Sequence, residues 1–383
     1  AQQCAYTGAG TVEFLLDNAS GEFYFLEMNT RLQVEHPVTE EVVRVRSASG
    51  SERVDLVELQ LLVATGEPLP FDQDDVTLEG HAIEARVYAE DSWNGFLPQA
   101  GTAVIVHWPE RARVDHALAS GQVVSTSYDP MLGKVIVSGP DRESARRALV
   151  SALDDTAILG LTTNTGFLRA LVASDEFRDA TIDTAWLDHH ELEQPSRDVA
   201  RVFVAWVQAL LVAQDTGHPF QSDGWRSGAD PAPTIVELDE TVRVDRARGL
   251  VGDYEVRELS AEQHVAVLAI DGRREQAVVN VQPHIAEVVH RGQRFVFDRP
   301  DVFAAHGPAA GAGTLSAPMP GTVLAVDVAE GDAVEEGQRL GVLEAMKMEL
   351  ALKAPFTGTV TTVGAKTADQ VALGQVLFVV EED

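Results

Sequence analysis

The chain has one cysteine, Cys4, among its 383 residues. A single cysteine cannot form a disulfide within the chain, and it excludes both a thiolate metal site and a CxxC redox pair. Basic residues are also scarce, since 29 Lys and Arg stand against 60 Asp and Glu and leave a formal net charge of −31. Such a charge repels nucleic acid and anionic membranes, so we expect neither as a partner.

Long apolar stretches are missing as well. No run approaches the roughly 18 residues that cross a bilayer, and the N-terminus lacks a basic region followed by an apolar one. We therefore predict a cytoplasmic protein. A hydrophobic content of 45% with 6% aromatic residues is ordinary for a chain that folds around a core, and the length predicts two or three domains.

An internal repeat is the clearest positive pattern. Residues 317–342 recur as residues 354–379 at a constant offset of 37, so that Gly321 corresponds to Gly358. Each copy has a Pro/Gly turn, a short β-branched run and a second Gly turn, which predicts a few strands that cannot bury their apolar face alone. Two copies about a pseudo-twofold axis would close a small sandwich and present Lys347, midway between them, at an exposed tip. The alternative is a surface lysine in an ordinary hairpin.

The sequence around this lysine, Glu344-Ala-Met-Lys-Met-Glu349, resembles the centre of a biotinyl domain. The resemblance implies an all-β flattened barrel of the biotinyl/lipoyl type. It also implies that a biotin protein ligase attaches biotin to Lys347, which becomes the end of a swinging arm. Lipoyl domains share the architecture but usually carry Asp-Lys-Ala at the tip, so Met346 and Met348 favour biotin over lipoate.

Near the N-terminus, residues 11–16 and 22–28 are strand-like, and the turn signal around Ser20 predicts an antiparallel hairpin. That hairpin places Glu13 opposite Glu27. Two carboxylates at about 5 Å destabilise the pair unless a cation lies between them. We therefore predict a divalent metal, Mg²⁺ (or Mn²⁺), held by oxygen ligands together with a phosphate-bearing substrate.

Polar residues continue beyond this strand at alternate positions. If the backbone stays extended, one face carries Glu27, Asn29, Arg31, Gln33 and Glu35, each about 7 Å from the next. Periodicity by itself leaves a second interpretation open, a solvated strand face with alternating charges.

The segment from Glu27 to Glu40, EMNTRLQVEHPVTE, is similar almost residue for residue to the signature of the biotin carboxylases, in the ATP-grasp superfamily. The resemblance implies three sets of residues: metal and ATP phosphate ligands (Glu13, Glu27, Asn29), a bicarbonate site (Arg31, Gln33 and the backbone of Val34), and a general base (Glu35). The base would take the bicarbonate proton, and the deprotonated bicarbonate would attack the γ-phosphoryl group of ATP to give carboxyphosphate.

Two further segments add to the resemblance. Residues 81–91, HAIEARVYAED, resemble the family segment whose arginine stabilises the biotin enolate, which implies that role for Arg86. Alternatively, Arg86 pairs with Glu84 or Asp91 across strands. Residues 127–134, SYDPMLGK, match a stretch near the biotin pocket, and there Asp129 takes a supporting role.

Two features depart from the family. Only 12 residues precede Glu13, and they contain no glycine-rich phosphate loop, so we expect this polypeptide alone not to bind ATP productively. In addition, residues 42–53 contain extra polar residues where the family has a short connection. We expect a surface loop there, or a segment that disturbs Glu35.

The remaining patterns define a multidomain α+β chain. Apolar periodicity predicts helices over 54–64, 144–153, 166–173 and 201–213, and alternation predicts strands over 254–259, 265–270, 277–281 and 294–297. The helix and strands in the middle resemble the docking domain of acyl-coenzyme A carboxylase α subunits, although the helix could be plain core. The predicted division is a C-terminal part of an ATP-grasp biotin carboxylase (1–192), a helix-plus-antiparallel-β docking domain (193–303), a flexible linker (304–316) and a biotinyl carrier domain (317–383).

As a whole, the resemblance implies the C-terminal part of an acyl-coenzyme A carboxylase α subunit. ATP and bicarbonate would carboxylate biotin on Lys347, and a partner carboxyltransferase β subunit would pass the carboxyl group to an acyl-coenzyme A, which implies a hetero-oligomer. The acyl group is left open among acetyl, propionyl, methylcrotonyl and geranyl. Two alternatives are a non-catalytic biotinylated carrier and scaffold fragment, and a lipoyl carrier of a dehydrogenase complex.

Overall fold

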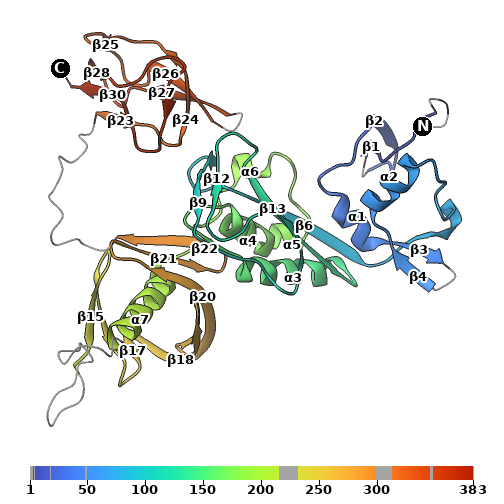
Figure 1. Cartoon of the computed structure of the whole chain (residues 1–383), viewed down its shortest axis with the longest axis horizontal. Coiled ribbons are helices and arrows are strands. Elements are labelled where there is room, and N and C mark those ends of the chain that lie inside the picture. The colour runs from blue at the N-terminus through green and yellow to red at the C-terminus, as the bar shows by residue number, and fades with distance from the viewer. Residues whose placement is uncertain are drawn as a thin grey trace.

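A computed structural model describes residues 3, 5–17, 19–47, 50–214, 232–298, 313–345 and 348–382. The elements follow one another as a mixed α and β unit up to residue 189, a helix with an eight-stranded sheet over 198–298, and an all-β unit after residue 313 (Figure 1). This confirms the expected multidomain α+β class. Among the described residues, no helix is both long and apolar enough to cross a membrane.

The first elements are a hairpin of β1 (Thr11–Leu16) and β2 (Phe23–Asn29). Its turn is fixed by Asp17, whose carboxylate accepts hydrogen bonds from the backbone of Ala19 at 2.9 Å and from Ser20 Oγ at 2.7 Å. The register pairs Glu13 with Glu27, as predicted. The large apolar side chains at positions 12, 14–16 and 23–26 are 46–67% exposed, so the described part of the chain covers neither face of this hairpin.

The described residues of the range 42–53 form regular structure where we expected a surface loop. After α1 (His36–Val42), β3 (Val43–Ser47) pairs with β4 (Gly50–Arg53) and with β5 (Val76–Leu78). The loop prediction was wrong because Val and Arg alternate at positions 43–46, which suits a strand with one buried face. Helix α2 (Leu56–Ala64), as predicted, and the short 3₁₀ helix η2 (Gln73–Asp75) lie between β4 and β5.

The rest of this unit is built around an antiparallel sheet in the order β11-β13-β6, formed by β11 (Arg113–His116), β13 (Met131–Gly139) and β6 (His81–Tyr88). The predicted helices are present as α3 (Arg142–Asp155), which packs on β6 and β13, and α4 (Thr165–Ala173). Shorter elements complete the unit: β7 (Glu90–Asp91), β8 (Leu97–Pro98), β9 (Gly101–Ala103), β10 (Ile105–His107), β12 (Gln122–Val124), β14 (Ala157–Leu159), α5 (Asp175–Arg178) and α6 (Trp186–His189).

In the middle unit, α7 (Asp198–Gln214) packs inside an eight-stranded antiparallel sheet that runs in sequential order from β15 to β22 (Figure 1). The predicted helix and all four predicted strand segments are confirmed. The strands are β15 (Thr234–Glu237), β16 (Thr241–Asp245), β17 (Leu250–Val251), β18 (Tyr254–Glu262), β19 (Val265–Ile270), β20 (Arg273–Val281), β21 (Ile285–His290) and β22 (Gln293–Asp298).

Replacing Phe203 by alanine should destabilise this middle unit strongly. Phe203 on α7 is fully buried at 0% exposure, and truncating such a side chain leaves a cavity that costs about 3–5 kcal/mol. Trp206 lies on the same helix and reports the transition by fluorescence during urea denaturation. The control is Leu211→Ala, because Leu211 is 49% exposed on the same helix and its loss should change stability by at most about 0.5 kcal/mol. Equal effects of the two changes would contradict the enclosed position of α7.

The mixed unit and the middle unit pack against each other. A small apolar cluster joins them, formed by Ala157 and Leu159 on β14 and by Val278 and Val289 on β20 and β21. Beside it, buried Glu287 accepts a hydrogen bond from the backbone of Gly160 at 3.1 Å. The middle unit is therefore packed against β14 of the mixed unit, and is not merely tethered to that unit.

The C-terminal unit consists of two four-stranded sheets, in the orders β23-β30-β28-β25 and β27-β26-β24-β29. Each repeat copy supplies the same three strands. The first copy supplies β24 (Gly321–Val326), β25 (Ala333–Val334) and β26 (Arg339–Ala345), and the second supplies β28 (Gly358–Val363), β29 (Gln370–Val371) and β30 (Val376–Glu381); β23 (Thr314–Ser316) and β27 (Met348–Lys353) complete the sheets. Because β24 pairs with β29 and β25 pairs with β28, the copies exchange their short strands. This reciprocal pairing is the predicted pseudo-twofold arrangement.

Candidate active site

Two carboxylates of the β1–β2 hairpin meet at one point. Nδ2 of Asn29 donates to Oε1 of Glu13 at 2.6 Å and to Oε1 of Glu27 at 3.2 Å, and Nε2 of Gln33 donates to the same Glu13 oxygen at 3.3 Å. The amide of Asn29 thus lies where a cation would relieve the repulsion between two like charges.

This trio fits a divalent cation. Rotation of the Asn29 amide would turn Oδ1 toward the same point, so that two carboxylates and one amide oxygen face it, the ligand type that Mg²⁺ prefers. The amide is needed, because among the described residues no three His, Cys, Asp or Glu side chains converge to hold a metal.

The backbone does not stay extended beyond Asn29. Strand β2 ends there, the chain bends at Arg31, and Glu35 takes the N-cap position of α1, with Pro37 in its first turn. The prediction of a shared extended face was wrong for this part, because the chain bends at Arg31 and turns at Val34 and Glu35 into a helix with Pro in its first turn. Gln33 still reaches Glu13, whereas the guanidinium of Arg31 donates to the adjacent carbonyl of Leu32 at 3.3 Å.

Arg86 lies between two carboxylates. Its Nη2 is 2.7 Å from Oε2 of Glu35, and its Nε is 3.2 Å from Oε1 of Glu84. The alternative pairing with Glu84 therefore exists alongside a contact with the predicted base. Burial raises the pKa of the Glu84 carboxyl, although the hydrogen bond from Arg86 and the charge of Lys134 oppose that rise. The Arg86–Glu35 pair itself is half exposed and open to substrate.

Lys134 contacts the same segment from the neighbouring strand. Lys134 on β13 is the cross-strand partner of Arg86 on β6, and its Nζ donates to the carbonyl of Val34 at 3.0 Å. It also lies 3.4 Å from Oδ2 of Asp115. Two adjacent cations therefore bind two consecutive residues, Val34 and Glu35.

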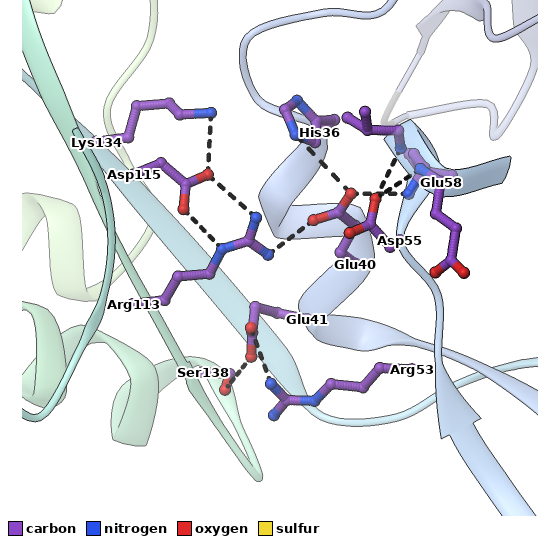
Figure 2. A network of polar contacts seen from close by, with 12 residues as sticks. His36, Glu40, Glu41, Arg53, Asp55, Glu58, Arg113, Asp115, Lys134 and Ser138 are labelled. Carbon is purple, nitrogen blue, oxygen red and sulfur yellow. Dashed lines mark hydrogen bonds and ion pairs between the residues drawn. The ribbon is translucent and has the colours of Figure 1, made fainter. Parts of the chain in front are cut away.

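Helix α1, which follows Glu35, is fixed by two buried carboxylates (Figure 2). Glu40 accepts hydrogen bonds from Nη1 of Arg113 at 2.7 Å and from the backbone of Leu56 at 2.9 Å. Glu41 accepts from Ser138 Oγ and from Nη1 of Arg53, each at 2.9 Å. The hairpin over 42–53 thus supports α1 through Arg53, and its contact is with Glu41 and not with the predicted base.

Replacing Arg113 by methionine should weaken this connection. Arg113 binds both Glu40 and Asp115, and removing one charged partner of a buried carboxylate costs about 1–3 kcal/mol. Although burial opposes it, Arg113 lowers the pKa of Asp115. The stabilisation is therefore present above the ordinary Asp pKa and is lost as pH falls through the lowered one. Calorimetry at neutral and acid pH should show a difference between the two proteins that shrinks in acid.

The control for Arg113 is Arg147→Met. Arg147 is 69% exposed and pairs with Glu143 at 3.6 Å, an arrangement that contributes little. A loss of stability as large as that of Arg113→Met would mean that the buried network is not responsible.

Two predicted site residues, Asp129 and Lys347, are not among the contacts described so far. Oδ1 of Asp129 accepts from the backbone of Met131 at 3.0 Å, and within the described residues none of the other predicted site residues hydrogen-bonds to it. Lys347, like Met346, lies outside the described residues. The strands on either side pair Ala345 with Met348 and Glu344 with Glu349, so the predicted biotinylation position falls in the short connection between β26 and β27.

Sequence reasoning did not single out Glu40, Arg113 or Lys134, and it named Glu84 only as an alternative partner of Arg86. For Lys134 a signal existed, because it is a charged residue inside an otherwise apolar strand, between Gly133 and Val135, and such a residue needs anionic or carbonyl partners when buried. Which partners these are depends on contacts 100 positions away in the sequence.

Three family models match the chain. Residues 1–71 match the carbamoyl-phosphate synthase L chain, ATP binding domain; residues 84–189 match the biotin carboxylase C-terminal domain; and residues 313–380 match the family of biotin-requiring enzymes. The chain therefore contains segments of an ATP-binding domain, a biotin carboxylase C-terminal domain and a domain of biotin-requiring enzymes. The family matches thus coincide with the two regions that carry the predicted chemistry, the carboxylate segment with Arg86 and the repeat around residue 347.

Curated relatives extend the similarity to most of this chain. The α subunit of mitochondrial methylcrotonoyl-CoA carboxylase from Arabidopsis thaliana is 33% identical over 92% of this chain and 55% of its own length; the Mus musculus protein is 34% identical over 92% and 53%. Chloroplastic biotin carboxylase 1 of Populus trichocarpa is 44% identical over 50% of this chain and 35% of its own length. The chain spans about half the length of the α subunits that it matches.

Two solved structures are also similar to this chain in sequence. The biotin carboxylase domain of a thermophilic 2-oxoglutarate carboxylase bound to bicarbonate is 38% identical, covers 49% of this chain and 41% of its own, and has a TM-score of 0.45. A single-chain, multi-domain long-chain acyl-CoA carboxylase is 26% identical over 98% of this chain and 29% of its own, with a TM-score of 0.40.

Proposed function

We propose that this chain is the part of an acyl-CoA carboxylase α subunit that binds bicarbonate, presents the general base and carries biotin. The observation that supports this most is the placement of Glu35. It lies at the start of α1, 2.7 Å from Arg86, on the segment that begins at the Glu13, Glu27 and Asn29 trio. The candidate base, Glu35, thus lies on the segment that follows the candidate metal site and contacts the guanidinium of Arg86 on β6.

Each side chain has a role in this proposal. Glu13, Glu27 and Asn29 would hold Mg²⁺, which would neutralise charge on the ATP phosphates. Arg31, Gln33 and the backbone of Val34 would bind bicarbonate, and Glu35 would remove its proton, so that a bicarbonate oxygen can attack the γ-phosphoryl group with ADP as leaving group.

Arg86 would act on the carboxyl acceptor. Biotin, when attached to Lys347, supplies the ureido nitrogen that accepts the carboxyl group. Carboxyphosphate would break down to CO₂ and phosphate, the phosphate would take the proton of the ureido nitrogen, and that nitrogen would attack CO₂ while the guanidinium of Arg86 stabilises negative charge on the ureido oxygen. Arg86 is held by Glu84 through Nε, which leaves its Nη2 directed toward Glu35 and the open side of the site.

The C-terminal unit would serve as the carrier and the middle unit as the docking domain. Tethering turns the encounter of the biotinyl arm with each active site into an intramolecular one at millimolar effective concentration. The middle unit, in which α7 packs inside the sheet, would hold a carboxyltransferase β subunit. A biotin protein ligase would attach biotin to Lys347. Since the α subunits that this chain resembles are named for methylcrotonoyl-CoA, we propose an acyl-CoA of that type as the acceptor.

Partner identification tests this proposal. The natural protein that contains this chain, captured on streptavidin from its own cells, should bring down a carboxyltransferase subunit. That complex should carboxylate methylcrotonoyl-CoA faster than acetyl-CoA or propionyl-CoA. Capture without a carboxyltransferase, or without ATP-dependent acyl-CoA carboxylation, would support the non-catalytic carrier instead.

A further inference from the structure

We infer that Lys134 is a positioning residue that holds the bicarbonate segment in place while Arg86 and Glu35 separate during turnover. The inference rests on the proposed function for its catalytic consequence. The position of segment 31–35 can be tested by a measurement that does not depend on enzymatic activity.

The first step concerns how segment 31–35 is attached to the sheet beneath it. Among the described residues, two side chains of the β6–β13 pair bind this segment: Arg86, which binds the Glu35 carboxylate at 2.7 Å, and Lys134, which binds the Val34 carbonyl at 3.0 Å. Because these two residues are direct cross-strand partners, their side chains project from neighbouring points of one sheet face.

The second step concerns how permanent each attachment is. The side chains of Arg86 and Glu35 are 39% and 50% exposed. Their pair must open when Glu35 takes a proton from bicarbonate and Arg86 turns to the carboxyl acceptor. The Lys134 side chain is 11% exposed, and its target is a backbone carbonyl that takes no part in the proposed proton transfer. The hydrogen bond from Lys134 to Val34 therefore persists when the pair between Arg86 and Glu35 opens.

The third step concerns the charge balance around Lys134. A buried ammonium needs compensation, which Asp115 supplies at 3.4 Å. Asp115 in turn is bound by Arg113, which also binds Glu40 on α1 (Figure 2). The two ends of this chain of contacts therefore lie on both sides of Glu35: Val34 precedes it and Glu40 follows it on α1.

Replacing Lys134 by methionine tests the positioning role. Hydrogen exchange at the amides of residues 31–42 should become at least about tenfold faster, because the segment loses one of its two side-chain attachments to the β6–β13 pair, while the carrier unit over 313–345 stays unchanged. In the natural protein, the KM for bicarbonate should rise about 10- to 100-fold, since misplacement by about 1 Å costs that much, and the KM for ATP should change less than about twofold. Lys134→Arg, which retains a cationic donor, should restore most of both properties.

The control is Arg169→Met, which removes a partly buried cation that pairs with Asp154 at 2.8 Å away from this segment. It should leave exchange at 31–42 and both KM values unchanged. Unchanged exchange in Lys134→Met, or a fall in kcat with both KM values constant, would overturn the inference. If the wild-type protein shows no bicarbonate-dependent ATP hydrolysis, the proposed function fails, and the exchange result still decides the position of Lys134.

Discussion

Replacing Lys347 by arginine should yield a chain that carries no biotin and supports no carboxyl transfer. Lysine is a primary amine that can be acylated, whereas a guanidinium at the same position keeps its charge and is not a substrate for amide formation. The fold should survive, because the core of the C-terminal unit is built from other residues, Leu340, Leu343, Val360 and Leu377, each at most 2% exposed. Loss of function would then be complete without loss of structure.

Intact-mass measurement after co-expression with a biotin ligase checks this result. The wild-type chain should gain the mass of one biotin, and the Lys347→Arg chain should gain none. Lys353→Arg is the matched control, because Lys353 is an exposed lysine at the end of β27 in the same unit, and that variant should be biotinylated normally. Biotin on the Lys347→Arg chain, or lipoate on the wild-type chain, would refute the assignment of the tip.

Replacing Glu35 by glutamine should lower bicarbonate-dependent ATP hydrolysis by about 10²- to 10⁴-fold, the usual contribution of a general base. Glutamine has nearly the same shape and can still accept a hydrogen bond from Arg86, so the geometry around Arg86 and Lys134 should remain. What is lost is the capacity to take a proton. Phosphate release in the natural protein, measured with and without bicarbonate, gives the effect directly.

Two comparisons make the Glu35 result specific. Biotinylation of Lys347 in the Glu35→Gln protein should be unaffected, because loading of the carrier does not use this site. Glu79→Gln should retain full turnover, since Glu79 is 58% exposed and pairs with Arg44, in the strand next to α1. Full turnover in the Glu35→Gln protein would exclude Glu35 as the base.

The local features of the site could be predicted from the sequence. Asp17 and Ser20 mark a turn whose position fixes the register of the hairpin, and the register then pairs Glu13 with Glu27. In the same way, an offset repeat of glycine turns was sufficient to predict two copies about a pseudo-twofold axis, and the β24–β29 and β25–β28 pairs show that the copies exchange their short strands. Patterns of this kind work because strand pairing and turn chemistry are set by neighbours in the sequence.

The remaining features depend on contacts between distant residues. The strand alternation continues past Asn29 in the sequence, but the chain bends at Arg31 and turns into helix α1 after Glu35, so Arg31 and Glu35 leave the shared face. The contacts of Lys134 with Val34 and of Arg113 with Glu40 join residues 100 and 73 positions apart. No local pattern encodes such pairs, because they form only when the sheet and α1 pack together.

Transfer of isotopically labelled carbon from bicarbonate to the biotinylated peptide that contains Lys347 is the most direct test of the account. In the natural protein, ATP and labelled bicarbonate should place an acid-labile label on that peptide, and Glu35→Gln should abolish the label while biotin itself remains attached. A biotinylated wild-type protein that takes up no label in the presence of ATP, or a label that persists after Glu35→Gln, would contradict it.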